Sequence, residues 1–431
     1  MTKPDAKHLC AERRAILSSC CGLTGEVTLT DSAVILLFAG MLGAGDMLSL
    51  ITTSVLPLFN GLLILPMAWW ASRAGRKKLI LGACSLAACA YFMAGSAPFF
   101  GSYAVPVLIS MILLFAMTLS GFIAGWFPML DTFLSGGRRT LFFGRMRFFH
   151  QLTAVLFLFL VSSVIGKTPP LWKLQAVLYL GAFIFMGRIF FIAAIPDFPV
   201  EKHDDPSWLK GLRTAAGNRK LRRFSVYQFV LNLAVYGSVP LSLLYLKNEL
   251  KAPDNVIVFI SAAALSGMLL GYLLIPRIIR ILGLKYTFIA LHALYLPVNI
   301  GLFFIEKGSF ATYALMILLL MLSSFAIAAT SIVCSAEMMA LATPGNKTMA
   351  MAFSGALYYS GAGLSRLLAS FALGSGLFAS AQMSGGMAFG PYRTLFLLYA
   401  AGTVAAGFFL FSIPAVADAS CPAGQPEEKR A

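Results

Sequence analysis

Two carboxylates interrupt an otherwise apolar stretch near the start of the chain, GLTGEVTLTDSAVILLF, which holds Glu26 and Asp31. An ionisable side chain is costly in hydrocarbon, so it is kept where it pairs with another charge, carries a proton or contacts a solute. The same reasoning applies to the other ionisable groups within apolar runs, which are Asp131, His150, Arg188, His292, Glu337 and Arg366.

Helical geometry separates the two acids. At 3.6 residues per turn, Glu26 and Asp31 point about 140° apart on an unbroken helix. Thr24, Thr28 and Asp31 are spaced four and three residues apart and form one polar stripe. We therefore expect Asp31 to face a polar cavity and Glu26 to face away from it, unless Gly22 and Gly25 break the helix and reorient Glu26.

An internal repeat supports this cavity. At one constant spacing, Arg14 corresponds to Arg222, Asp46 to Asp254, and Gly75 to Gly283. The same spacing places Gln228, Asn232 and Tyr236 opposite Cys20, Thr24 and Thr28. The sequence therefore predicts an equivalent polar stripe in the second half of the chain, facing the same cavity.

Depth in the membrane suggests a partner for Asp31. At 1.5 Å per residue, Asp31 and Arg366 both lie roughly 25–28 Å from the inner boundary, one in each half. We expect them either to pair and close the outer side or to hold substrate between them. Glu26 falls near the midplane, where desolvation favours the neutral acid and suits a proton site.

For proton coupling, the candidates are Glu26 and Asp31, with His150 as a partner of Glu26. The alternative for Glu26 is a locally hydrogen-bonded structural acid. Four further residues are candidates to line the cavity: Trp126, Glu337, Tyr358 and Tyr359. For the three aromatic residues the alternative is packing, which is the more common role of an aromatic side chain in a membrane span. Arg188 is close enough to the inner end of its span to snorkel, and His292 is interpreted as structural.

Composition indicates that lipid surrounds most of this chain. Its 431 residues are 59% hydrophobic and only 12% charged, whereas soluble domains carry about 25% charged residues. Apolar runs long enough to cross about 30 Å of hydrocarbon recur to the end. They predict an all-α integral membrane protein with spans near 14–42, 47–72, 79–97, 103–133, 141–165, 174–195, 223–246, 255–281, 286–305, 311–341, 348–378 and 392–413.

The repeat divides these spans into two pseudo-symmetric six-helix halves. We expect an N-terminal half over residues 1–195, a cytoplasmic linker over 196–222 with a short amphipathic surface helix around Trp208–Arg219, and a C-terminal half over 223–431. Most loop lysines and arginines fall on the side of the two termini, which places both ends in the cytoplasm. A bacterial inner membrane is the expected location.

The net charge of +16 is explained by the basic cytoplasmic loops and not by a basic face on a soluble domain. We therefore expect no nucleic-acid partner. The seven cysteines indicate neither a disulfide frame nor a metal site. The sequence beginning MTKPDAKHLCAERR lacks the apolar core of a signal peptide. We expect no metal and no cofactor, and a chain that functions as a monomer in the bilayer.

The loop AWWASRAGRKK connects the second and third spans, and with the six-plus-six pattern it resembles the major facilitator superfamily of secondary transporters. Arg73, Gly75, Arg76 and Lys77 match the loop motif of that family, while Ser72 stands at its acidic position. The resemblance implies a turn with charge contacts that hold one conformer on the cytoplasmic side. Because the motif's own acid is missing, Asp131 is the candidate partner for Arg73 or Arg76.

Together these features predict a secondary transporter that moves a small polar solute, anionic or zwitterionic, by alternating access with proton coupling. One alternative is an exporter of amphiphilic compounds, although the family's drug-antiporter signature is absent from RFFHQLTAVLFLFLVSSVIG. Another is a non-transporting receptor on the same fold. An enzyme is not expected, because the chain has no HExxH, Gly-x-Ser-x-Gly or phosphate-loop motif.

Overall fold

The computed structural model describes residues 6–134, 139–198, 208–306, 308–343, 346–378, 390–411 and 413–417. All regular structure in these ranges is helical. The first half of the chain forms α1 (Ala6–Thr30), α2 (Ala33–Met41), α3 (Asp46–Ala74), α4 (Arg76–Gly95), the 3₁₀ helix η1 (Ala97–Tyr103), α5 (Ala104–Leu130), α6 (Arg139–Ile165) and α7 (Leu171–Ala193).

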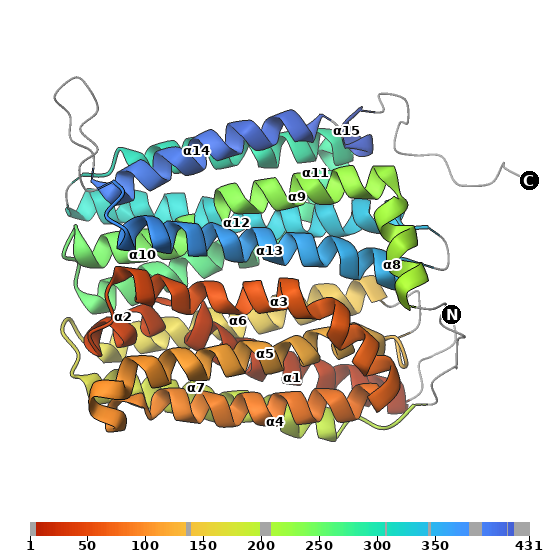
Figure 1. Ribbon diagram of the computed structural model, residues 1–431, viewed down its shortest axis with the longest axis horizontal. Helices are drawn as coiled ribbons and strands as arrows, with labels where there is room; N and C mark the ends of the chain where they lie inside the picture. Colours follow the sequence, from red (N-terminus) through yellow and green to blue (C-terminus); the bar gives the residue numbers. More distant parts are fainter. Residues whose placement is uncertain are drawn as a thin grey trace, which may run out of the picture.

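The segment between the halves carries a short helix, α8 (Trp208–Gly217), where a helix was expected. The second half forms α9 (Arg219–Val235), α10 (Ser238–Asn248), α11 (Asp254–Phe303), α12 (Phe310–Leu341), α13 (Lys347–Gly374), α14 (Pro391–Leu410) and α15 (Pro414–Ala417). Helices α1 to α7 lie on one side of the molecule and α9 to α14 on the other (Figure 1).

Ten helical stretches of the described residues are long and apolar enough to cross a membrane. The longest, α11, is continuous over 50 residues but holds Gly283 at φ +75°, so it contains two of the expected spans. With α13, whose 28 residues also exceed the length of a crossing, the arrangement confirms an all-α membrane protein built on the twelve-helix plan.

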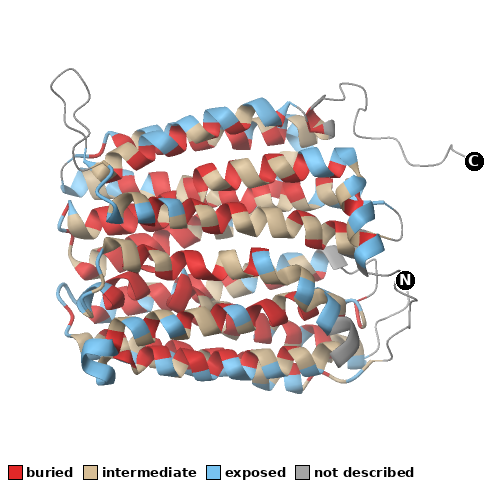
Figure 2. Cartoon of the chain, viewed as in Figure 1, coloured by how far each residue is buried: buried red, intermediate tan, exposed pale blue. Residues whose placement is uncertain are grey.

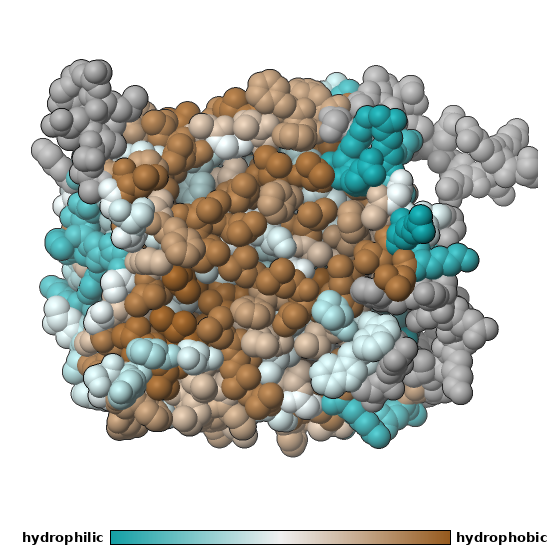
Figure 3. Space-filling model, in the orientation of Figure 1, coloured by the Kyte–Doolittle hydropathy of each residue, from teal (hydrophilic) through white to brown (hydrophobic). Residues whose placement is uncertain are grey.

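The surface agrees with a lipid surround. Leu160, Phe183 and Phe408 keep 61%, 69% and 79% of their surface exposed. Figure 2 shows that exposed positions follow the helices at the margins, including α4 and α14, while buried positions fill the middle. Apolar residues form a broad band, and hydrophilic residues gather at its two ends (Figure 3). The chain is therefore an integral membrane protein.

The two ends of the bundle are distinct. One, the α8 end, carries α8 and α15; the other, the α2 end, carries α2 and η1 (Figure 1). The first turns of α1 lie at the α8 end beside the end of α7, since the Arg14 guanidinium donates to the carbonyl oxygen of Ala194.

Two spans predicted to be continuous are in fact broken. The first is interrupted at Asp31 and Ser32, and Ser32 caps α2 by accepting a hydrogen bond from Val34 N. Thr28, Thr30 and Ser32 each donate to the carbonyl four residues earlier, a bond that competes with regular helix geometry. The equivalent span of the second half breaks between Val235 and Ser238. Gly22 and Gly25 remain inside α1.

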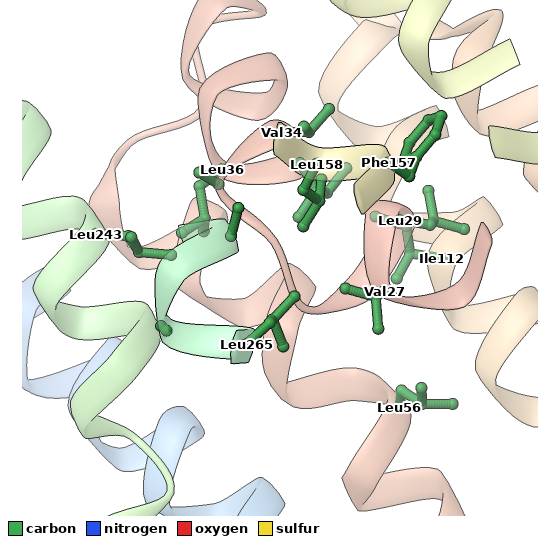
Figure 4. Packing of buried hydrophobic residues seen from close by; sticks show 14 of the residues in the cluster. Val27, Leu29, Val34, Leu36, Leu56, Ile112, Phe157, Leu158, Leu243 and Leu265 are labelled. Atoms are coloured by element: carbon green, nitrogen blue, oxygen red, sulfur yellow. The ribbon is translucent and has the colours of Figure 1, made fainter. Parts of the chain in front are cut away.

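The two halves meet along helices whose small residues allow close approach. Helix α3 packs on α13, and α6 packs on α11. A Cβ at Gly61 would lie 2.4 Å from Ser360 Oγ, and one at Gly363 would lie 2.4 Å from Leu58 Cγ. At the α2 end, α2 contacts α10 and α11, and a hydrophobic cluster that includes Leu36, Leu243 and Leu265 closes the interface (Figure 4).

The repeat is visible in two matching turns. Gly75 joins α3 to α4 at φ +87°, and Gly283 divides α11 at φ +75°. An L-residue incurs a steric cost at positive φ, which glycine avoids. Both turns sit at the same position of the repeat, so each half uses the same device to reverse direction.

We expect Gly75→Ala or Gly283→Ala to destabilise the protein by about 1–2 kcal/mol, because alanine is strained at positive φ. Thermal unfolding in detergent measures this. Gly82→Ala is the matched control: Gly82 lies within α4, and a Cβ added there would meet no other atom within 4 Å, so alanine should be neutral or stabilising by up to about 1 kcal/mol. Equal melting temperatures for all three variants would contradict the explanation.

Candidate functional site

Arg366 of α13 is held between the two broken helices. Its side chain is 7% exposed, and its Nη2 lies 2.8 Å from Asp31 Oδ1, at the break between α1 and α2. Its Nε donates to the carbonyl oxygen of Tyr236 at 3.3 Å, at the break between α9 and α10. Its Nη1 donates to the Thr53 carbonyl of α3 at 2.7 Å. The structure therefore brings together Asp31 and Arg366, the two residues predicted to lie at similar depth.

The breaks explain why a buried cation is stable here. The last carbonyls of a helix lack intrahelical donors and carry the negative end of the helix dipole. Helices α1 and α9 both end beside Arg366, and Asp31 supplies a full negative charge. The carboxylate keeps 43% of its side-chain surface accessible, so this pair joins a buried cation to an accessible acid.

Other polar contacts join the halves around Arg366, toward the α2 end. Asp46 Oδ1 accepts from Asn248 Nδ2 at 2.6 Å, and its Oδ2 accepts from Tyr392 Oη at 2.5 Å. Ser370 Oγ donates to the Met47 carbonyl at 2.5 Å, and Ala33 N donates to Ser261 Oγ at 3.2 Å. The α2 end of the interface is therefore closed by hydrogen bonds as well as by apolar packing.

Glu26 makes a second ion pair, within the first half. Its Oε2 lies 3.2 Å from Nη2 of Arg188 in α7, and the two side chains are 18% and 3% exposed. The guanidinium carbon lies 4.1 Å from the ring centroid of Phe122 and 5.1 Å from that of Phe185. A Cβ at Gly22 would fall 1.6 Å from Arg188 Nε. Glycine at this position of α1 is what admits the arginine.

This pair corrects two expectations. Glu26 pairs with Arg188 and not with His150, because α7 packs directly on α1. Arg188 does not snorkel to the membrane surface, because its charge is compensated inside the bundle. Its Nε and Nη1 are buried and make no hydrogen bond among the described residues, so Glu26 provides the main compensation for this cation.

The expected polar stripe on α1 is also wrong. Thr24 and Thr28 are buried, and their hydroxyls donate to the carbonyls of Cys20 and Thr24 at 2.9 and 2.7 Å. Thr24 Oγ1 also lies 3.3 Å from Thr153 Oγ1 of α6, so this part of α1 packs on a helix of its own half, while Asp31 beyond it pairs with Arg366. Glu26 instead lies within electrostatic range of Tyr359 in the other half. The face assignment failed because it used spacing alone and could not show which helices pack on α1.

In the second half, the predicted stripe binds α13 rather than lining open space along its whole length. Gln228 and Asn232 are buried: Gln228 Oε1 accepts from Ser354 Oγ at 2.7 Å, and Asn232 Nδ2 donates to the Tyr358 carbonyl at 3.1 Å. Tyr236 is partly accessible, and its hydroxyl is hydrogen-bonded to that of Tyr358. Tyr359 packs edge-on against Tyr358.

Two other cavity candidates lie elsewhere. Trp126 is buried in the first half, with its ring centroid 5.1 Å from that of Phe122. Trp126 therefore packs on Phe122, the ring that the Arg188 guanidinium contacts. Glu337 is buried in α12, and its Oε1 accepts from Ala415 N of α15 at 3.3 Å.

His150 is partly buried on α6, within electrostatic range of Arg147 and Arg188. His292 is hydrogen-bonded inside the second half, to Tyr227 and the Thr403 carbonyl.

The loop predicted to form a latch lies at the α8 end. Arg76 Nη1 donates to the Pro128 carbonyl at 3.1 Å, and Lys77 Nζ lies 3.0 Å from Asp197 Oδ1 and 2.7 Å from the Ile195 carbonyl. Asp131 is exposed at the end of α5, and the side chain of Arg73 lies outside the described residues. Lys77 of this loop therefore pairs with Asp197, which follows α7.

Two residues that were not predicted as site candidates also lie where the halves meet. Tyr272 of α11 lies within electrostatic range of Tyr236, Tyr358 and Tyr359. The guanidinium carbon of Arg147 lies 5.6 Å from the Tyr272 ring centroid. Arg147 stands near the start of a span, where basic residues usually set topology, and Tyr272 sits in an apolar run. Only the helix packing shows that they meet. Among the described residues, no group of His, Cys, Asp and Glu could hold a metal ion.

Comparison with known proteins gives the fold. No family model matches the chain, and no curated protein matches its sequence. A variant of the nucleoside transporter NupG is 14% identical with a TM-score of 0.70, covering 94% of this chain and 99% of its own.

The human organic anion transporter MFSD10 is 15% identical with a TM-score of 0.67, covering 94% and 99%. A bacterial homologue of the human lysosomal transporter Spinster, in an inward-facing conformation, is 13% identical with a TM-score of 0.66, covering 98% and 100%. At these identities the likeness concerns the fold, and it extends over nearly the whole of each chain. The chain therefore has the fold of the major facilitator superfamily of secondary transporters.

Proposed function

We propose that this protein is a secondary transporter that moves a small polar solute across the membrane by alternating access, coupled to protons. The α8 end faces the cytoplasm, as the basic loops predict, and the α2 end faces outward. We further propose a bacterial inner membrane, both termini in the cytoplasm, and function as a monomer without a cofactor or an enzymatic activity. The similar structures are transporters for different solutes, so they support transport without selecting its substrate.

One observation carries the proposal: Arg366 is bonded to both halves at once. Its partners Asp31 and Thr53 belong to the first half, and Tyr236 belongs to the second. A buried cation that loses its partners is strongly destabilised unless water or another group replaces them. The contact therefore favours two arrangements, one dry and closed and one open and hydrated, which is what an outer gate requires.

The halves supply the moving parts. Residues 1–195 and 223–431 would rock against each other around the interface of α3 with α13 and of α6 with α11, with 196–222 as the connection. The broken helices place irregular backbone at the interface, and transporters often use such breaks at their binding sites. Substrate would bind between the halves, on the α8 side of Arg366.

Glu26 is the proposed proton carrier. The charged and titratable groups around it are Arg188 of α7, Asp31 beyond its own helix, Cys84 of α4 and Tyr359 of α13. Protonation removes the charge that compensates Arg188, leaving a buried cation without its counter-charge. The protonated state is stabilised if an anionic group approaches or if the interface rearranges. Proton binding is therefore linked to solute binding and to conformation.

We expect Arg366→Gln to open the α2 end. The substitution removes the charge that binds Asp31, so the population of the outward-open state should rise at least about tenfold, a change of ~1.4 kcal/mol. Hydrogen–deuterium exchange of the purified protein measures this as faster uptake in residues 46–53 and 236–248.

Arg393→Gln is the matched control, since Arg393 lies at the same end but pairs with Glu306 of its own half, at 2.9 Å. Its exchange at the gate should match that of the unmodified protein. Unchanged exchange in the Arg366 variant, or a uniform rise over the whole chain, would contradict the gate.

We expect Glu26→Gln to remove proton coupling. Proteoliposomes are incubated in a mixture of metabolites, and uptake is measured with and without an inward proton gradient. The unmodified protein should accumulate a solute faster with the gradient, while the Glu26 variant should take it up at the same rate in both conditions, because glutamine cannot bind the proton.

Glu249→Gln is the control, because Glu249 is exposed at the end of α10; it should retain the proton dependence. If the Glu26 variant keeps that dependence, the carrier is another acid, Asp31 first. If the unmodified protein accumulates no solute from any mixture, the transporter proposal itself is wrong.

A further inference from the structure

Four tyrosines gather where the halves meet: Tyr236, which follows α9, Tyr272 of α11, and Tyr358 and Tyr359 of α13. We call them the tyrosine cluster. The rings of Tyr236 and Tyr358 lie edge to face with centroids 5.8 Å apart, and those of Tyr358 and Tyr359 lie at 5.3 Å and 90°. All four keep part of their surface accessible. The cluster therefore offers ring edges, ring faces and hydroxyl groups deep in the bundle.

One cation from the opposite half borders this cluster. Arg147 of α6 is half-buried, contacts the face of Tyr272, and lies within electrostatic range of Tyr359. Among the described residues it forms no ion pair and no hydrogen bond through its guanidinium. The Tyr272 ring covers one face of the guanidinium. The N–H groups at the edge of the guanidinium have no acceptor in the described part of the chain.

The charges nearby are otherwise balanced. Glu26 compensates Arg188 at 3.2 Å, and Asp31 compensates Arg366 at 2.8 Å. Each pair is formally neutral, so Arg147 is the cation beside the tyrosine cluster that has no acidic partner among the described residues. A half-buried cation without an acid is stabilised by an anion that arrives from solution.

We propose that the substrate is a planar aromatic compound carrying a single carboxylate, bound with its carboxylate on Arg147 and its ring among the tyrosine cluster. The inference rests on the proposed transport function and specifies its substrate class. A guanidinium presents two parallel N–H groups that match one carboxylate. Aromatic rings prefer the offset and edge-to-face contacts that the cluster presents. One uncompensated cation selects a monoanion over a dianion or a neutral solute.

Three small probes separate these features. Benzoate has both the ring and the carboxylate, cyclohexanecarboxylate keeps the charge without the aromatic ring, and benzamide keeps the ring without the charge. Binding to the full-length protein in lipid nanodiscs is measured by calorimetry. We expect benzoate to bind most tightly, and terephthalate, a dianion, to bind more weakly than benzoate.

Arg147→Gln should weaken benzoate binding about tenfold or more, since a hydrogen bond to a charged group contributes roughly 1.5–3 kcal/mol and tenfold is about 1.4 kcal/mol. The same variant should bind benzamide as the unmodified protein does. Arg145→Gln is the matched control: Arg145 lies two residues away on the same helix and is exposed. Its benzoate affinity should not change. Tyr272→Leu should reduce the preference for benzoate over cyclohexanecarboxylate.

Two results would overturn the inference while leaving the transporter intact. One is a solute accumulated by the proteoliposomes that lacks either the carboxylate or the aromatic ring and whose uptake benzoate does not compete. The other is an equal effect of the Arg147 and Arg145 substitutions on benzoate. Absence of all solute uptake, in contrast, is the failure of the proposed function itself.

Discussion

The need to compensate Arg366 organises the centre of this molecule. A guanidinium that is 7% exposed inside a membrane protein requires acceptors for its N–H groups and a negative charge. No single helix of regular geometry can supply them, because its carbonyls are already bonded. The chain provides them by ending α1 and α9 early, by placing Asp31 at one break, and through the Thr53 carbonyl of α3, whose usual helical donor would be Pro57, which has no N–H. The breaks, the closed α2 end and the contact between the halves all meet at this one side chain.

The second buried arginine obeys the same rule differently. Arg188 and its acid belong to one half, so the two partners stay together when the halves move. Its N–H groups are only partly bonded, and aromatic rings cover much of the remaining surface. In the proposed mechanism, Arg366 responds to the arrangement of the halves and Arg188 responds to the protonation of Glu26. A proton and a conformational change would then be linked without a shared side chain.

Much of this could be predicted from sequence, for identifiable reasons. The apolar runs predicted the helical membrane fold because length and hydropathy constrain a chain in lipid directly. The repeat predicted matching turns at Gly75 and Gly283, since glycine at positive φ is a local property. The proximity of Asp31 and Arg366 followed from counting residues along two helices, which works when only depth matters.

Rotation around a helix was harder to predict. Spacing placed Thr24 and Thr28 on one face of the first helix but could not show that α6 and α7 pack on α1, so the assignments of Thr24, Thr28 and Glu26 did not hold. The pairing of Glu26 with Arg188 depends on which helices are neighbours, and Arg147 meets Tyr272 only because α6 packs on α11. These facts arise from the packing of distant segments, and one sequence contains no direct signal for them.

Gly22 has a consequence for how this chain can change over generations. Its missing side chain is the space that Arg188 occupies, with only 1.6 Å between a Cβ there and Nε. A larger residue at 22 therefore requires the guanidinium of Arg188 to move from its present place beside Glu26. A substitution at Gly22 thus acts on Glu26 through Arg188, so the three positions are expected to change in a coupled way.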